Sequence, residues 1–329
     1  MTRRGVAAPP CTLPLPSIFF PMKILLTGAS GLVGAAFAAA AQRRGHHVVG
    51  VVRTSVATIP GLAEKRTLDL TENNAATGLI LELFPDAIVN CAAVSEPAAC
   101  DADPARAQSL NVTLPATLAK LAHHLSARLV HVSTEQVFAG DRAPYAPGDA
   151  PRPLNLYGRQ KLESERLVHV AAPEFAATVR APLLTGNSLG VVRSLHERLL
   201  ADWAAGRTPR LYRDEIRQPC TAGNLAEVLL ELCERPELKG VFHWAGAEAL
   251  SRVELAKRIR AHFKLSAEAA PIEEANRADD PGVTARRAAD LRMELKPLAG
   301  RLKTSLETFD AQLDQLVLPP AVRAWYFAS

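Results

Sequence analysis

Three glycines follow the first apolar segment of the chain, residues 23–27, in the spacing Gly-x-x-Gly-x-x-Gly, and an alanine-rich segment comes after them. A buried strand, a tight glycine turn and a helix in this order present backbone N–H groups and a helix N-terminus to an anion. The alternative is a turn whose glycines only satisfy backbone angles. Because the turn stands at the start of the first strand–helix unit, we favour a dinucleotide site. Its predicted contacts are Gly28, Ser30, Gly31, Leu32, Val33 and Gly34.

Strand-like and helix-like segments alternate from Met22 to about Pro182. The predicted strands are 23–27, 47–53, 87–93 and 128–133, and the predicted helices are 32–44, 105–122 and 157–170. Strands separated by helices indicate a parallel sheet covered on both faces. We therefore predict the α/β class with a doubly wound parallel sheet, and an NAD(P)-binding Rossmann domain over residues 22–182.

The alternation of strand-like and helix-like segments becomes less regular after Pro182. We expect helices over 191–205, 224–234, 252–263 and 305–316, a strand over 241–246, and a polar loop over 271–281. Residues 183–329 should form mainly a smaller α/β lobe that binds the substrate. The predicted site is the cleft between the two lobes, at the carboxyl ends of the strands.

Residues 1–21 differ from the rest of the chain because they contain Arg3, Arg4 and several prolines. A secretory signal would need a continuous apolar helix after its arginines, and Pro14 and Pro16 interrupt that region. We expect a disordered extension, with Met22 opening the folded domain.

Composition excludes several classes of protein. The net charge is only +4 and no basic block occurs, which argues against nucleic-acid binding. The longest strongly apolar stretch, 31–41, is shorter than the roughly 18 residues that a membrane helix needs. The five cysteines form no Cys-x-x-Cys pair, and no set of residues has metal-ligand spacing. The cytoplasm is therefore the expected location, and a homodimer is one assembly that the sequence allows.

Arg53 stands at the end of the second predicted strand with no acidic residue beside it. An acid at this place binds the adenosine ribose hydroxyl of NAD, whereas an arginine suits the 2′-phosphate of NADP. NADP(H) is therefore favoured, with NAD(H) as the alternative. Asp69 and Leu70 follow a short third strand, where the carboxylate would lie near the adenine amine or cap the next helix.

Tyr157 and Lys161 are four residues apart, so they share one face of the predicted helix. An ammonium beside a phenol stabilises the phenolate and lowers the tyrosine pKa, which suits proton donation to a carbonyl. The same lysine can hydrogen-bond the nicotinamide ribose. Ser133 and Thr134 end a strand where a hydroxyl can hold a substrate carbonyl. Taken in this order after the glycine turn, these residues favour a catalytic site over a solvated helix lysine.

The motifs together resemble the extended short-chain dehydrogenase/reductases. They are the glycine turn, Asn90-Cys91-Ala92-Ala93, Asn111, His131-Val132-Ser133-Thr134 and Tyr-x-x-x-Lys. Within that class, the run from Pro153 to Gly158 followed by Lys161-Leu162-Glu163 is similar to the dTDP-4-dehydrorhamnose reductase family. The segments 137–140 and 144–145 fit the same family.

The resemblance implies roles for particular residues. Thr134, Tyr157 and Lys161 would form the catalytic triad, and Asn111 would support a proton relay through the lysine. The residues implied to line the cofactor are Ala92, Ala93 and Val94. Hydride would pass from the nicotinamide to the keto carbon of a nucleotide-linked sugar, the expected small-molecule partner, while Tyr157 protonates the oxygen.

Several positions depart from the family pattern, and they leave alternatives open. Glu135 and Gln136 stand where aspartate and tyrosine are usual, and Asn224 replaces a usual aspartate. The segments 240–246 and 251–256 are similar to the regulatory beta subunit of methionine adenosyltransferase, which implies a non-catalytic NADP-binding role. A sugar-nucleotide epimerase, which uses the same triad, is a third alternative.

Overall fold

The computed structural model of the chain describes residues 20–54, 58–190, 192–280, 282 and 286–328. Most of the predicted N-terminal extension, residues 1–19, lies outside the described residues. A seven-stranded sheet occupies the centre of the fold, and every pair of neighbouring strands in it is parallel. Its order is β3 (Glu64–Thr67), β2 (His47–Val52), β1 (Lys23–Thr27), β4 (Ala87–Asn90), β5 (Arg128–Thr134), β6 (Ala176–Ala181) and β11 (Gly240–His243).

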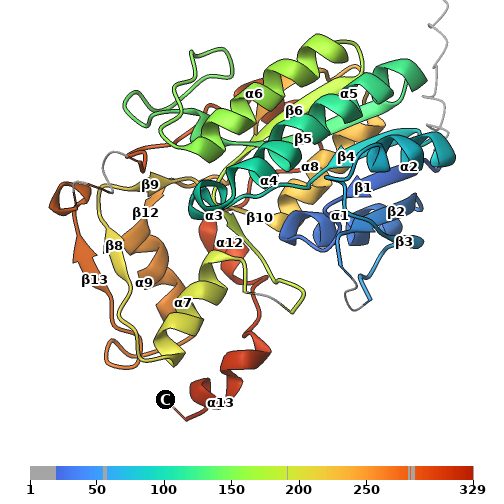
Figure 1. Cartoon of the computed structure of the whole chain (residues 1–329). Coiled ribbons are helices and arrows are strands. Elements are labelled where there is room, and N and C mark those ends of the chain that lie inside the picture. The colour runs from blue at the N-terminus through green and yellow to red at the C-terminus, as the bar shows by residue number, and fades with distance from the viewer. Residues whose placement is uncertain (1–19, 55–57, 191, 281, 283–285, 329) are drawn as a thin grey trace, which may run out of the picture.

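Helices cover both faces of this sheet, which confirms the predicted doubly wound α/β class (Figure 1). Alternate side chains of a strand enter opposite layers. Ile24 and Leu26 of β1 belong to one apolar core, and Leu25 belongs to the other. The first core includes α1 (Leu32–Arg43) and α8 (Ala222–Glu234), and the second includes α2 (Ala75–Leu83), α5 (Leu114–Leu125) and α6 (Leu156–Ala171).

A second group of elements forms its own apolar core beside the sheet, at the lower left of Figure 1. It is built from α7 (Leu195–Ala204), β8 (Arg210–Tyr212), β9 (Ile216–Arg217), β12 (Leu250–Ser251), α9 (Arg252–His262), β13 (Glu273–Ala275), α12 (Phe309–Leu313) and α13 (Arg323–Tyr326). The division of the chain near residue 182 stays a prediction. Helix α8 and strand β11 follow that residue in sequence but lie in the layers of the large sheet.

Short elements complete the described chain. They are α3 (Pro97–Ala102), α4 (Pro104–Gln108), β7 (Leu184–Thr185), β10 (Cys220–Thr221), α11 (Lys296–Ala299) and short turns over Glu135–Val137, Arg277–Asp279 and Pro320–Val322. None of the described helices is both long and apolar enough to cross a membrane. The cytoplasmic location stays a prediction.

Three predicted elements show the largest differences from the structure. The predicted helix 105–122 is interrupted by a π-helical turn over Ser109–Thr113, so that α4 and α5 are separate helices. The predicted loop 271–281 contains β13, which pairs in parallel with β8. The predicted helix 305–316 is reduced to Phe309–Leu313.

Candidate active site

The glycine turn joins β1 to α1 and lies against the end of β4. Gly28 has a φ of +67°, and a Cβ there would come within 2.7 Å of the Ala92 backbone nitrogen. A Cβ on Gly34 would come within 2.3 Å of the Gly28 carbonyl oxygen. These two positions therefore require glycine for the turn itself, whether or not an anion binds.

The N-terminus of α1 has the properties that a pyrophosphate needs. The helix begins after Gly31, no side chain caps its first turn, and that turn carries no acidic residue. The backbone N–H groups of the first turn of α1 therefore have no side-chain acceptor among the described residues. They lie at the N-terminus, which is the positive end of the helix dipole. These residues fit the predicted dinucleotide, and their contacts with it, including those of Ser30, Leu32 and Val33, stay predictions.

The two residues predicted near the adenosine have different surroundings. Arg53 is exposed directly after β2 and has no ion pair with any residue that the structure describes. Asp69 accepts hydrogen bonds from the backbone and hydroxyl of Thr71 and pairs with Arg106 at 3.2 Å. These hydrogen bonds and the guanidinium hold the Asp69 pKa below its usual value. Asp69 does not cap the next helix, because α2 begins only at Ala75.

Tyr157, Lys161 and Thr134 are brought together where β5 ends and α6 begins. Asn155 starts α6 by accepting a hydrogen bond from the Gly158 backbone at 2.8 Å, and this cap fixes the first turn, which carries Tyr157. The Thr134 side chain lies near enough to the Tyr157 hydroxyl to lower its pKa. Lys161 follows one turn later, and all three side chains are buried.

Burial shifts the pKa values of Tyr157 and Lys161 in the directions that favour the neutral phenol and the neutral amine. Desolvation raises the pKa of Tyr157, and the nearby Thr134 side chain opposes this shift. Desolvation lowers the pKa of Lys161 to about 8, against the opposing charge of Glu165. A phenol that keeps its proton and an amine that titrates near neutral pH are suited to passing one proton.

Asn111 lies in the π-helical turn and clamps the backbone of Val94. Its side-chain oxygen accepts from the Val94 nitrogen at 2.9 Å, and its amide donates to the Val94 oxygen and to Gln160. Among the described residues, no hydrogen bond links its side chain to Lys161. The structure therefore ties Asn111 to the predicted cofactor-lining segment 92–94, and its part in a proton relay stays a prediction.

Sequence reasoning missed a group of buried polar residues beneath Lys161. The Lys161 amine lies 3.2 Å from Nε2 of His131, which is buried and also approaches Ser164 and Asn90. His131 opens the motif His131-Val132-Ser133-Thr134, but nothing in the spacing of that motif points to Lys161. The sequence feature that could have indicated this buried polar group is a histidine among the apolar residues of a central strand.

The residues that depart from the family pattern form buried or partly buried polar contacts with other elements of the fold. Glu135 is buried and pairs with Arg217 of β9 at 3.4 Å. Desolvation raises the Glu135 pKa to about 7, while Arg217 opposes the shift. Gln136 accepts a hydrogen bond from Asn155, and Asn224 accepts one from the indole of Trp244.

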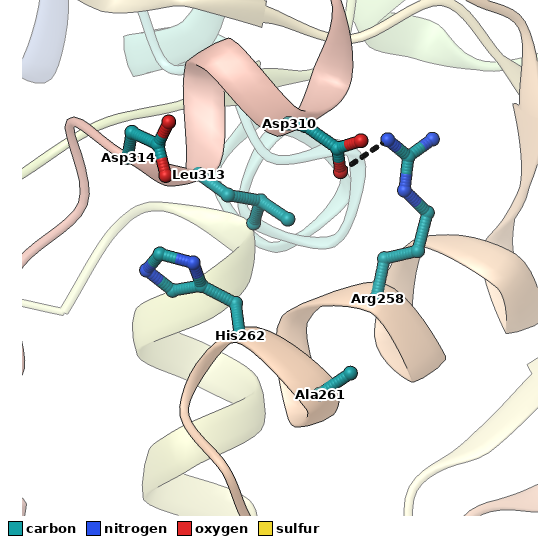
Figure 2. A pocket seen from close by; sticks show the side chains of 6 residues that line it. All are labelled: Arg258, Ala261, His262, Asp310, Leu313 and Asp314. Carbon is teal, nitrogen blue, oxygen red and sulfur yellow. Dashed lines mark ion pairs between the residues drawn. The ribbon is translucent and has the colours of Figure 1, made fainter.

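A cavity of about 240 Å³ lies elsewhere, between α9 and α12 (Figure 2). Arg258 and Asp310 form an ion pair across it, and His262 and Leu313 also line it. None of the predicted site residues belongs to this cavity.

Residues 22–319 match the family described as the RmlD substrate binding domain. The chain belongs to this family. It is 33% identical over 255 residues to methionine adenosyltransferase 2 subunit beta of Xenopus laevis, covering 74% of this chain and 72% of that protein. It is 30% identical over 241 residues to the probable low-salt glycan biosynthesis reductase Agl14 of Haloferax volcanii, covering 72% of this chain and 79% of that protein.

Solved structures agree with the family. The hypothetical dTDP-4-dehydrorhamnose reductase from Sulfolobus tokodaii matches with a TM-score of 0.76 and 28% identity, over 90% of this chain and all of that one. A dTDP-4-dehydrorhamnose reductase from Bacillus anthracis, solved in complex with NADP, has a TM-score of 0.74 at 20% identity, over 90% of this chain and 98% of that one. The latter identity shows the fold alone. Both family resemblances predicted from the motifs are confirmed.

Proposed function

We propose that this protein is a reductase that uses NADP(H) to reduce a keto group on a nucleotide-linked sugar. The observation that carries the proposal is the shared burial of Thr134, Tyr157 and Lys161, with Lys161 one turn after Tyr157 on α6. The reductases among the similar proteins support the same chemistry.

The glycine turn would hold the dinucleotide, which when bound would supply a hydride for the keto carbon. Thr134 and Tyr157 would hold the keto oxygen, and Tyr157 would give it a proton as negative charge develops there. The Lys161 ammonium then stabilises the phenolate that remains, because opposite charges in a buried site attract strongly, and it restores the phenol by passing one of its protons to it. The balance is one hydride and one proton added to the carbonyl, which becomes an alcohol.

NADP(H) is the proposed cofactor because Arg53 is exposed at the end of β2 with no ion pair among the described residues. Its guanidinium is thus available to a 2′-phosphate, which an arginine binds through paired hydrogen bonds. Use of NAD(H) is the alternative.

A second candidate function is a non-catalytic, NADP-binding regulatory subunit. It is favoured by the 33% identity to methionine adenosyltransferase 2 subunit beta, which spans most of both chains. In that case the buried triad would only hold the cofactor. The epimerase alternative would keep its nicotinamide through purification, since an epimerase returns the hydride to its substrate, whereas a reductase exchanges the cofactor at every turnover.

The deciding experiment follows NADPH oxidation with a panel of nucleotide-linked 4-keto sugars. We expect turnover by the natural protein and a loss of at least about 10²-fold in Tyr157→Phe, the usual scale for removing a general acid. NADPH affinity should stay nearly unchanged in that variant. The matched control is Tyr326→Phe, whose hydroxyl donates to the Phe263 carbonyl in the other group of elements. Full turnover by Tyr157→Phe would remove that residue from its role, and silence of the natural protein with tight NADPH binding would favour the regulatory subunit.

A further inference from the structure

A continuous chain of hydrogen bonds runs through the interior beneath the catalytic lysine. Thr27 donates to the side-chain oxygen of Asn90 at 2.6 Å, and the Asn90 amide nitrogen lies 3.0 Å from Nδ1 of His131. Nε2 of His131 lies 3.1 Å from the Ser164 hydroxyl, which donates to the Lys161 carbonyl at 2.7 Å. The chain thus links β1, β4, β5 and α6 through buried side chains.

The direction of these bonds fixes the tautomer of His131. An amide nitrogen is a donor only, so Nδ1 must accept from Asn90 and cannot carry a hydrogen. Burial and the charge of Lys161 hold the pKa of His131 well below its usual value, so the ring is neutral. A neutral imidazole without a hydrogen on Nδ1 carries it on Nε2. The Ser164 hydroxyl donates its own hydrogen to the Lys161 carbonyl, so its oxygen can accept the hydrogen on Nε2 of His131.

The same Nε2 lies 3.2 Å from the Lys161 amine. An ammonium has no lone pair and cannot accept the N–H of His131, whereas a neutral amine can. We propose that His131 is a positioning residue for the reduction: its Nε2–H faces the Lys161 amine, holds the amine in place and favours the form that has released its proton. This inference rests on the proposed function and deepens it, because it explains how the lysine gives up a proton in a closed interior.

Other ionisable groups near Lys161 and His131 also affect the pKa values of these two residues. Glu165, on the next turn of α6, favours the ammonium, and its own charge is shared with Arg180 of β6. Cys91, at the end of β4, acts in the same direction as Glu165. Tyr157 lies on the same face of α6, and His169, near the C-terminal end of that helix, lowers the pKa of His131. None of these groups presents an N–H to the lysine amine as His131 does.

The test uses variants that change the N–H next to Lys161. His131→Phe keeps a flat ring and removes the donor, so we expect the pKa of Lys161 to rise by about half a unit to one unit, the size of a typical net hydrogen bond. Ser164→Ala removes the competing acceptor and leaves the N–H wholly to the amine, so the lysine pKa should fall. Because the variants act in opposite directions, a general loss of stability cannot imitate the pair, and Ser164→Ala carries the test should His131→Phe not fold.

The matched control is Thr178→Val. Thr178 pairs with His131 across β5 and β6, is buried, and has an Oγ1 without a hydrogen-bond partner in the described structure. Its replacement by an isosteric valine removes a polar group at the same depth without touching the hydrogen-bonded chain. The lysine pKa should not move.

Two readouts separate this inference from the proposed function. In the NADP⁺-loaded protein, the carbon-13 shift of the Lys161 ε-carbon, assigned with Lys161→Arg, reports the lysine pKa without any turnover. In the active protein, the pH at which kcat/KM declines on the alkaline side should change with the lysine pKa. It should move to higher pH in His131→Phe and to lower pH in Ser164→Ala. An unmoved or lowered pKa in His131→Phe, or a raised one in Ser164→Ala, would overturn the inference. The expected NMR shifts in a protein that reduces none of the sugars would support the tuning of Lys161 and overturn the reductase.

Discussion

The buried ion pair between Glu165 and Arg180 provides a test of how the site is anchored. Glu165 lies on α6 one turn after Lys161, and Arg180 lies on β6. The guanidinium reaches both carboxylate oxygens, at 2.8 to 3.2 Å, and Ser133 donates to the same carboxylate at 2.5 Å. Both partners are about 5% exposed or less, so water cannot replace a lost bond.

Glu165→Gln leaves the Arg180 charge buried without its counter-ion. Removal of one partner of such a pair costs about 3–5 kcal/mol. The remaining contacts of Arg180, with the Pro147 carbonyl, His243 and the face of Phe138, do not neutralise it. Since domains are stable by only about 5–15 kcal/mol, this loss is a large part of the total.

Equilibrium unfolding in urea, followed by fluorescence and circular dichroism, measures the loss. The matched control is Glu237→Gln, whose partner Arg235 lies at 2.9 Å on the surface. That exposed pair should be worth about 0–1 kcal/mol. The reasoning is refuted if Glu165→Gln loses no more stability than Glu237→Gln. It is also refuted if the double change Glu165→Leu with Arg180→Met, which removes both charges, is less stable than Glu165→Gln alone.

Two further predictions concern the dinucleotide site. Arg53→Asp should shift the ratio of kcat/KM from NADPH toward NADH, because the carboxylate repels a 2′-phosphate and accepts from a ribose hydroxyl; an equal loss with both cofactors would show that Arg53 does not distinguish them. Gly34→Ala should cost about 1–3 kcal/mol of stability and weaken NADPH binding, because its Cβ meets the Gly28 carbonyl at 2.3 Å. The control is Gly78→Ala in α2, where a Cβ would meet no other atom within 4 Å. Thermal melting should show that this variant gains about 0.5–1 kcal/mol of stability. Equal changes of stability in the two variants would contradict the reasoning.

The sheet could be predicted because its strands are apolar on both faces. Residues of β1 enter both cores, so a continuous apolar run was the correct pattern for a parallel strand. The π-helical turn at Ser109–Thr113 could not be predicted, because one extra residue in a turn leaves the apolar spacing nearly intact on either side. Strand β13, with the sequence Glu-Glu-Ala, has no strand pattern and exists through its pairing with β8.

Part of the candidate site could likewise be predicted from the sequence, and part could not. The spacing of Tyr157 and Lys161 predicted a shared helix face, since four residues is a local property of a helix. The surroundings of Lys161 come from Thr27, Asn90 and His131, which lie on three different strands. Contacts of that kind depend on strand order and register, which a single sequence does not encode in any local spacing.

The polar residues of β5 explain the position of helix α6 on the sheet. His131 and Ser133 are two residues apart on the strand and therefore point to the same face, where they meet Ser164 and Glu165 of α6. Apolar packing is non-directional and leaves a helix free to slide along a sheet at small cost, whereas two buried hydrogen bonds of fixed length do not. The position of Lys161 is therefore fixed by buried polar side chains of β5 that hold α6 in one register.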